Sequence, residues 1–228
     1  MNVKNAAVGL VASVAVAAGA TLVGIAPAEA GAKNTLFINP GRPIANETFA
    51  ATGTLSTPMK RKAVLQLVSA GKWKNVDTDT TSSSGVFNVS SHTSVDRQFR
   101  IVAPAITING KTYPRITGVT KIVDVVSQTA VVTVSNTSPQ VGEVVKIVGR
   151  FTPVRKGRAV RAYIRVGGIS YGLGARVQSS TGLAVWYVTT EASDVGTTAQ
   201  FFVRALEYNG AAELFSNRVD VTAVSPPE

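Results

Sequence analysis

The hydrophobic pattern of this chain is that of β-strands throughout. Short runs rich in Val, Ile, Thr, Phe and Tyr are separated by Gly, Pro, Asn and Ser, which is typical of strands joined by tight turns. The alternation is clearest in Phe99, Ile101 and Ala103, where every second residue is apolar and would face a core. No segment carries the apolar spacing of an amphipathic helix over three turns. The pattern therefore predicts an all-β protein.

The predicted strands fall into two sets. In the first half we expect them near residues 35–38, 48–55, 63–69, 73–80, 86–91, 98–104 and 119–126. In the second half we expect them near residues 130–135, 144–151, 159–166, 170–177, 183–190, 198–207 and 213–223. About seven strands in roughly a hundred residues favour an antiparallel two-sheet sandwich in each half. An antiparallel β-barrel is the alternative that this pattern leaves open.

The predicted strand at 63–69 allows two inward faces. An inward set of Ala63, Leu65 and Leu67 avoids burying Gln66, and we prefer it. Aligning this strand with its counterpart in the second half favours the other set, with Val64 inward. A one-residue insertion or deletion in the preceding loop would reconcile the two.

Motifs repeat between the two halves, which indicates a duplicated unit. Pro43, Glu47 and Gly53 recur 96 residues later as Pro139, Glu143 and Gly149. The Val-Asp-Val segment at 123–125 matches 219–221 at the same offset, whereas 98–103 matches 200–205 at an offset of 102. The loops must therefore differ in length, with the longer insertion after 98–103 in the first unit and before 200–205 in the second. We predict two domains, at residues 31–128 and 129–228, joined by a very short linker at 127–129.

Residues 1–30 have the features of an export signal. Lys4 precedes a long stretch rich in Ala, Val and Gly, which ends in Ala28-Glu29-Ala30. A positive head, an apolar middle and small residues before the cut predict a secretory signal peptide, cleaved before Gly31. An uncleaved membrane anchor is the alternative, because the apolar stretch is nearly long enough to span a bilayer. We expect a secreted, cell-surface-associated protein.

Charge and cysteine content narrow the chemistry further. The chain has no cysteine, which excludes disulfides, thiolate metal sites and a cysteine nucleophile. Its formal charge is +10, from 23 basic and 13 acidic residues. Such a charge attracts anionic polymers. The partner that we expect is an anionic envelope polymer, such as a wall polyanion or an acidic polysaccharide, or another surface protein, and we do not expect nucleic acid. The alternative is that the positive charge only keeps an exported protein soluble.

Two basic loops and one tryptophan are the candidate binding elements. The loops occupy matching places before the third strand of each unit, and loops at the end of a sandwich often bind ligands. Trp73 lies between two lysines and could stack on a sugar ring. The candidate ligand-binding residues are Lys60, Arg61, Lys62, Lys72, Trp73, Lys74, Arg155, Lys156 and Arg158. The alternative is that the basic residues only keep loops solvated or guard edge strands against aggregation, and that Trp73 packs at a sheet edge.

Catalytic and metal-binding patterns are weak. The single histidine, His92, lies in a polar loop near Ser90, Ser91 and Asp96, but adjacency along the chain does not build a Ser-His-Asp arrangement. Asp77 and Asp79 would project from one strand face, yet calcium requires about six or more oxygens. We assign no catalytic residue, metal site or cofactor, and we expect Trp186 to be a core residue.

The first unit resembles a known family. Its matching features are Gly53-Thr54-Leu55, the basic loop at 60–62, Val64 to Gln66, Gly71 with Trp73, the threonines at 78–81, and Ser84-Gly85 with Phe87. This order is similar to that of the immunoglobulin-like β-sandwich repeats of secreted actinobacterial proteins. The resemblance implies two tandem immunoglobulin-like antiparallel β-sandwiches that act as spacers or binding modules, with no catalytic residues. The second unit departs from the pattern, since Gly168 to Tyr171 replaces the Gly-Lys-Trp segment and no threonine run follows.

Three functions are compatible with these features. The first is a secreted, noncatalytic structural or adhesive module at the cell envelope. The second is a binding protein for anionic polymers, which would use the paired basic loops. The third, from a different class, is a small secreted hydrolase that depends on His92 or on a carboxylate pair that the sequence does not single out.

Overall fold

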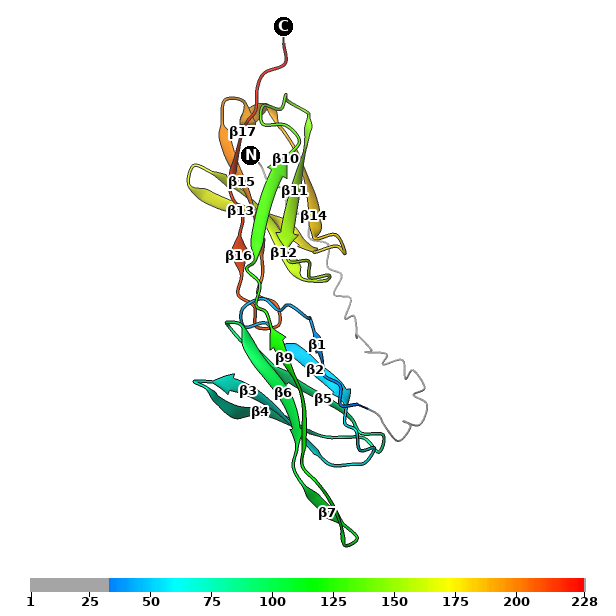
Figure 1. Ribbon diagram of the computed structural model, residues 1–228. Coiled ribbons are helices and arrows are strands. Elements are labelled where there is room, and N and C mark those ends of the chain that lie inside the picture. Colours follow the sequence, from blue (N-terminus) through cyan, green and yellow to red (C-terminus); the bar gives the residue numbers. More distant parts are fainter. Residues whose placement is uncertain (1–32, 228) are drawn as a thin grey trace.

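The protein consists of two antiparallel β-sandwiches placed end to end (Figure 1). The computed structural model describes residues 33–227, in which the only helical element is the 3₁₀ turn η1 (Ala192–Asp194). The predicted all-β class and the tandem of antiparallel sandwiches are thus confirmed. The predicted signal peptide, 1–30, lies outside the described residues. Within 33–227, no helix has the length and apolar character needed to cross a membrane.

The first sandwich packs a three-stranded sheet against a four-stranded one. Its strands are β1 (Phe37–Asn39), β2 (Phe49–Thr54), β3 (Lys62–Ser69), β4 (Lys72–Thr80), β5 (Val86–Ser91), β6 (Arg97–Ala103), β7 (Ile106–Ile108), β8 (Lys111–Tyr113) and β9 (Ile116–Val123). The smaller sheet has the order β1-β2-β5 and the larger one β4-β3-β6-β9. Strands β7 and β8 form a separate hairpin that projects from the end of the molecule (Figure 1).

The second sandwich repeats this plan. Its strands are β10 (Thr129–Val134), β11 (Val144–Thr152), β12 (Ala159–Val166), β13 (Ile169–Val177), β14 (Leu183–Thr189), β15 (Thr198–Ala205), β16 (Leu214–Phe215) and β17 (Val219–Thr222). The smaller sheet has the order β10-β11-β14. The larger one has the order β13-β12-β15, with β16 and β17 both paired to β15. In both sandwiches the fourth strand pairs with the third, so it lies in the larger sheet.

Strand register shows how the two copies correspond. Leu65 pairs with Ile101 and Ala162 pairs with Val203, so Leu65 corresponds to Ala162. The third strand is therefore offset by 97 rather than 96, which is the one-residue shift that the basic loop was expected to contain. Ala63 and Leu65 are fully buried and Leu67 packs against them, so the preferred inward face is confirmed.

One sequence match between the copies is wrong by two residues. Arg97 pairs with Val123, and the corresponding Ala199 pairs with Val221, so Val123 corresponds to Val221 and not to Val219. The parallel bridges Ile44–Val126 and Gln140–Val224 give the same two-residue shift. Because side chains alternate with a period of two, a slip of two keeps every residue on its expected face. The hydrophobic pattern alone therefore cannot detect this error.

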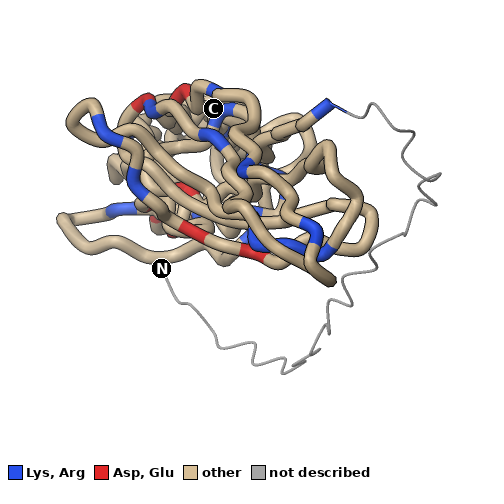
Figure 2. The backbone as a smooth tube through the Cα atoms, turned by 60° about the horizontal axis from the view of Figure 1, so that its bottom comes forward, with Lys and Arg blue, Asp and Glu red and all other residues tan. Residues whose placement is uncertain are grey.

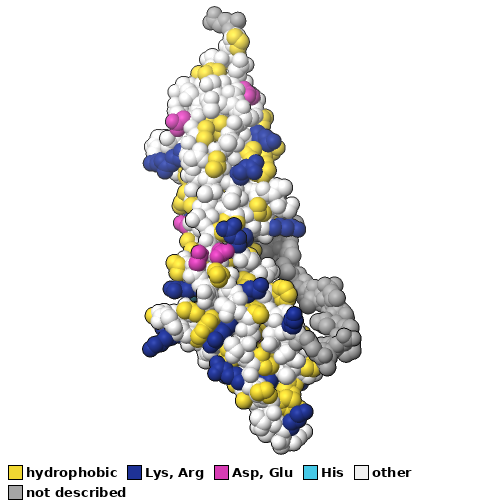
Figure 3. Space-filling view, in the orientation of Figure 1, with side chains coloured by type: hydrophobic (Ala, Val, Ile, Leu, Met, Phe, Trp, Pro, Cys, Tyr) yellow, Lys and Arg dark blue, Asp and Glu magenta, His cyan; other side chains and the backbone are white. Residues whose placement is uncertain are grey.

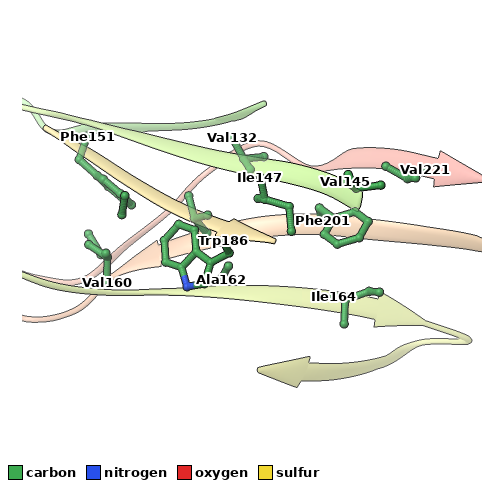
Figure 4. Packing of buried hydrophobic residues seen from close by; sticks show 13 residues of the cluster. Val132, Val145, Ile147, Phe151, Val160, Ala162, Ile164, Trp186, Phe201 and Val221 are labelled. Atoms are coloured by element: carbon green, nitrogen blue, oxygen red, sulfur yellow. The ribbon is translucent and has the colours of Figure 1, made fainter. Parts of the chain in front are cut away.

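Each sandwich has its own hydrophobic core. The first core centres on Phe49, Phe87 and Phe99, and the second on Trp186 and Phe201, and no residue belongs to both clusters. Trp186 is 2% exposed, as expected for a core residue. Figure 4 shows it in the middle of the second core, with Val145, Ile164 and Phe201 grouped toward one end.

The repeated Pro and Glu residues close the same turn in both copies, and the repeated Gly lies within the strand that follows. The Glu47 carboxylate accepts the Ile44 N–H at 2.7 Å, and the Glu143 carboxylate accepts the Gln140 N–H at 3.1 Å. The carbonyls of Pro43 and Pro139 each accept an N–H from the last strand segment of their sandwich, at 2.9 Å. Gly53 must lack a side chain, since a Cβ there would lie 2.2 Å from the Thr35 carbonyl oxygen.

Candidate binding surface

The basic loop of the first sandwich is only partly available to a ligand. Lys60 and Lys62 are exposed, but Arg61 is 2% exposed. Its guanidinium donates to the carbonyl oxygens of Pro104 and Pro114, the latter at 2.9 Å, and to the Thr57 hydroxyl at 3.2 Å. Arg61 therefore ties the base of the β6–β9 connection to its own loop.

The second basic loop repeats this use of a buried arginine. Arg158, also 2% exposed, donates to the carbonyl oxygens of Leu206 and Ala212, both at 2.8 Å. These carbonyls lie in the connection that follows β15, the counterpart of the one that Arg61 holds. Burial lowers the pKa of both arginines from the ordinary value, and for Arg158 nearby Glu47 opposes that effect. Both guanidiniums stay charged at neutral pH because arginine is always protonated there.

Arg155 of the second loop bridges the two sandwiches. Its guanidinium binds the Glu47 carboxylate through both oxygens, at 2.5 and 2.7 Å, and also donates to the Arg42 carbonyl at 2.9 Å. Glu47 is 1% exposed. Of the residues predicted in this loop, only Lys156 is exposed to solvent. The second loop faces the joint because the sandwiches are stacked head to tail.

Further contacts hold the joint between the sandwiches. The Thr48 N–H donates to the Asn209 carbonyl at 2.7 Å. In the linker, the Gln128 side chain accepts from Arg158 at 2.8 Å and donates to the Ala212 carbonyl at 2.9 Å. Gly210 approaches so closely that a Cβ would lie 2.6 Å from the Asn46 carbonyl oxygen, and its φ is +88°. A polar cleft of about 700 Å³ lies beside these contacts.

Trp73 is stacked by an arginine on the outer face of the larger sheet. The Arg100 guanidinium lies 3.9 Å from the centre of the Trp73 ring, and its Nε donates to Gln66 at 2.9 Å. Lys72 and Lys74 are neighbours of Trp73 along β4, so their side chains leave the opposite face of the strand. The structure therefore does not group these three side chains into one site.

The second sandwich carries an aromatic and arginine strip that sequence reasoning missed. On the outer face of its larger sheet, the Tyr163 and Phe202 rings stack at 5.1 Å, and Phe215 lies 6.2 Å from Phe202. Arg204 and Arg218 lie over Phe215 and Phe202, at 5.2 and 5.5 Å. The available signal was the alternation of Phe202 and Arg204 with the core residues of β15. The rings and guanidiniums of this strip largely stack on one another, and Phe215 forms its exposed end.

Asp77 and Asp79 cap the edge of the neighbouring sheet. Their carboxylates accept the N–H groups of Ser90 and Asn88 on β5, at 2.7 and 2.8 Å. His92 is exposed, and the nearby Asp96 carboxylate accepts the Val125 N–H at 2.7 Å. Among residues 33–227, no three His, Cys, Asp or Glu side chains gather in a way that could hold a metal ion.

The exposed positive charge is dispersed. Figure 2 shows Lys and Arg positions on many separate loops and strands. Figure 3 shows them spread along the length of the visible face, with white and hydrophobic surface between them. The basic side chains thus do not form one continuous patch on that face.

Comparisons with known proteins assign no family. No family model matches the chain, and no curated protein is similar to it. Among solved structures, the chain is similar to a tetra-tandem repeat in the extending region of a large adhesion protein. The identity is 15% and the TM-score 0.37, over 83% of this chain and 49% of that one. The chain thus spans about half the length of that structure, and a likeness this distant says nothing about function.

Proposed function

We propose that this protein is a secreted, noncatalytic module of two immunoglobulin-like sandwiches that serves as a structural spacer or adhesive unit at the cell envelope. The observation that carries this proposal is the joint. Arg155 and Glu47 form a bidentate ion pair between the sandwiches, and Glu47 is buried. The linker side chain Gln128 is bonded on both sides.

A joint of this kind suits a spacer because it resists bending. A linker acts as a flexible tether when it is long and rich in Gly and Ser. Here β9 ends at Val123, the Val126 N–H is bonded to the Pro43 carbonyl at 2.9 Å, and β10 begins at Thr129. Only Ser127 and Gln128 lie between these bonded positions, so the two sandwiches have little freedom to swing.

Distance measurements between the sandwiches test the spacer role. The chain has no cysteine, so Thr78→Cys and Thr189→Cys place one spin label on each sandwich at exposed strand positions. We expect a narrow distance distribution by pulsed electron resonance, which Arg155→Ala broadens. Arg150→Ala removes an exposed arginine from β11 and should leave the distribution narrow. A broad distribution in the parent chain would contradict the proposal.

Binding of anionic polymers is a second candidate function. It is favoured by the lysines that the structure leaves exposed, namely Lys60, Lys62, Lys72, Lys74 and Lys156. The buried Arg61 and Arg158 are unavailable for it, and Arg155 is engaged in the joint. Retention on a polyanion column should fall steeply with salt. Replacing the five lysines with Gln should lower retention more than the same change at Lys33, Lys111, Lys121, Lys146 and Arg176, and equal elution would count against it.

The noncatalytic part of the proposal has its own test. A broad screen with ester, glycoside and peptide substrates should find no turnover. Activity that His92→Ala abolishes would replace this proposal with a hydrolase.

A further inference from the structure

The second sandwich contains an apolar pocket between its two sheets. The pocket has a volume of about 700 Å³ and lies at the end of the sandwich away from the joint, where β11 begins and β14 ends. Side chains from both sheets line it, among them Val145, Ile164, Leu173, Val188 and Phe201. Its volume and apolar lining are those of small-molecule sites, which commonly measure about 300–1,000 Å³.

The pocket lies where the second copy has a valine and the first copy has a phenylalanine. Strand register equates Val145 with Phe49, since they pair with the corresponding residues Val188 and Ser91. In the first sandwich, Phe49 packs edge-on against Phe99, with ring centres 5.1 Å apart. In the second sandwich the partner ring is present as Phe201, but Val145 is too small to reach it in the same way.

The edge between β13 and β14 is also held by fewer side-chain hydrogen bonds than the matching edge of the first sandwich. In the first copy, Asp77 and Asp79 bind β4 to the backbone of β5. Arg176 takes the place of Asp79 in the second copy, because it pairs with Val160, the counterpart of Ala63. The side-chain bond that spans β13 and β14 runs instead from the Trp186 indole N–H to the Gly174 carbonyl, at 3.1 Å. Strand β13 has no Asp or Glu along its whole length, so the part of it that lines the pocket also lacks the carboxylate bonds of the first copy.

The charge of the lining restricts what can enter. Asp194 is the one charged residue among the described residues that line the pocket. Its carboxylate already accepts the Glu191 N–H at 2.9 Å. An anionic ligand group would lose its hydration there and meet a like charge, which is costly, and the Asp194 carboxylate is already engaged with the backbone. An uncharged, slender ligand suits a pocket between two sheets, because packed sheets are only about 10 Å apart.

We propose that this pocket binds the hydrocarbon chain of an uncharged ligand. The chain enters between β13 and β14 and packs against Val145, Ile164 and Phe201. The site is independent of the joint, so it adds a ligand to the proposed spacer without relying on the spacer role. A free aliphatic alcohol and the acyl chain of a neutral lipid are two sources of the same chemistry.

The test restores the residue that the first sandwich uses. Val145→Phe should fill the pocket, while Val144→Phe makes the same change one residue away, at an exposed position on the opposite face of β11. The neutral dye N-phenyl-1-naphthylamine should bind the full-length mature chain with increased fluorescence and be displaced by 1-dodecanol. Val145→Phe should weaken dye binding at least about tenfold, and Val144→Phe should leave it unchanged. If Val145→Phe fails to fold, Leu173→Trp offers a second way to block the pocket.

Further measurements distinguish a free alcohol from a lipid chain, and both of these from a second copy of the protein. Sedimentation with phosphatidylcholine vesicles that is lost in Val145→Phe identifies a lipid chain, whereas displacement by dodecanol alone identifies a free one. Dye binding that persists in both blocking variants overturns the proposal, and so does a parent chain that binds neither dye nor vesicles. Dodecanoate that competes as well as dodecanol overturns the preference for an uncharged ligand. Self-association of the parent chain that Val145→Phe abolishes would show that the occupant is a second copy.

Discussion

Arg61 and Arg158 occupy corresponding places in the two sandwiches, whereas Phe49 and Val145 correspond but build different cores. The buried arginines close the loops at one end of each sandwich through carbonyl oxygens. The turn closed by Glu47 recurs around Glu143. The comparison shows that side chains which bond to the backbone at these places recur in both copies, where removing one would leave an unpaired backbone group.

The apolar core residues differ more between the two copies than these polar groups do. Val89 and Trp186 correspond, as do Phe87 and Ala184, because each pair occupies the same register against β2 or β11. The bulk at the centre of the second core is therefore concentrated in one indole, and the end around Val145 is less filled. Cores tolerate such exchanges when the total volume is roughly maintained. The pocket lies at the end of the second core where that volume is not maintained.

The strongest test of the comparison is to separate the copies. Residues 31–128 expressed alone should give a soluble β-protein that melts cooperatively, because the first core shares no residue with the second. Circular dichroism during thermal melting measures this. An unfolded fragment beside a folded full-length chain would show that the sandwiches are one cooperative unit, and would refute the division at 128–129.

A second test contrasts the two core centres. Trp186→Ala should cost about 3–5 kcal/mol of unfolding free energy, because it leaves a large cavity. Val89→Ala at the corresponding position should cost about 2 kcal/mol. Guanidinium unfolding followed by circular dichroism compares them. Similar losses would mean that Trp186 does not dominate its core as its position suggests (Figure 4).

The buried arginines should behave alike. Arg61→Met and Arg158→Met should each lower the unfolding free energy by about 2–3 kcal/mol, since each leaves carbonyl oxygens without a donor. Lys60→Met changes an exposed neighbour and should stay within about 0.5 kcal/mol of the parent. An unchanged unfolding free energy in Arg61→Met beside a large loss in Arg158→Met would show that only the arginine next to the joint stabilises the protein.

The smallest expected effect concerns the sheet edges. Asp77→Ala and Asp79→Ala should each cost about 1 kcal/mol, because the freed N–H groups of β5 can bond to water. The exposed Asp124 is a suitable control. Removing both carboxylates should also promote self-association through the bared edge of β5, which gel filtration measures. An unchanged double variant would mean that these carboxylates do not protect the edge.

Much of the fold could be predicted from sequence, and little of the binding surface could. The expected strands are present, because alternation reports which residues face a core, except that the one expected near 213–223 is divided into β16 and β17. The added β7–β8 hairpin accounts for the long insertion expected in the first unit, and the segment around η1 for that in the second. The burial of Arg61 could not be foreseen, since its partners Pro104 and Pro114 are far away in sequence. A basic loop looks the same in sequence whether its arginines reach solvent or a carbonyl.

The parallel bridges near the ends of each sandwich have a mechanical consequence. Ile44 runs beside Val126, and Gln140 beside Val224. The bonds from the Val126 and Val224 N–H groups to the carbonyls of Pro43 and Pro139 join the early part of each sandwich to its last segment. Because these neighbours run in the same direction, a pull along the chain slides one past the other. Tension would thus load the bonds between them in shear.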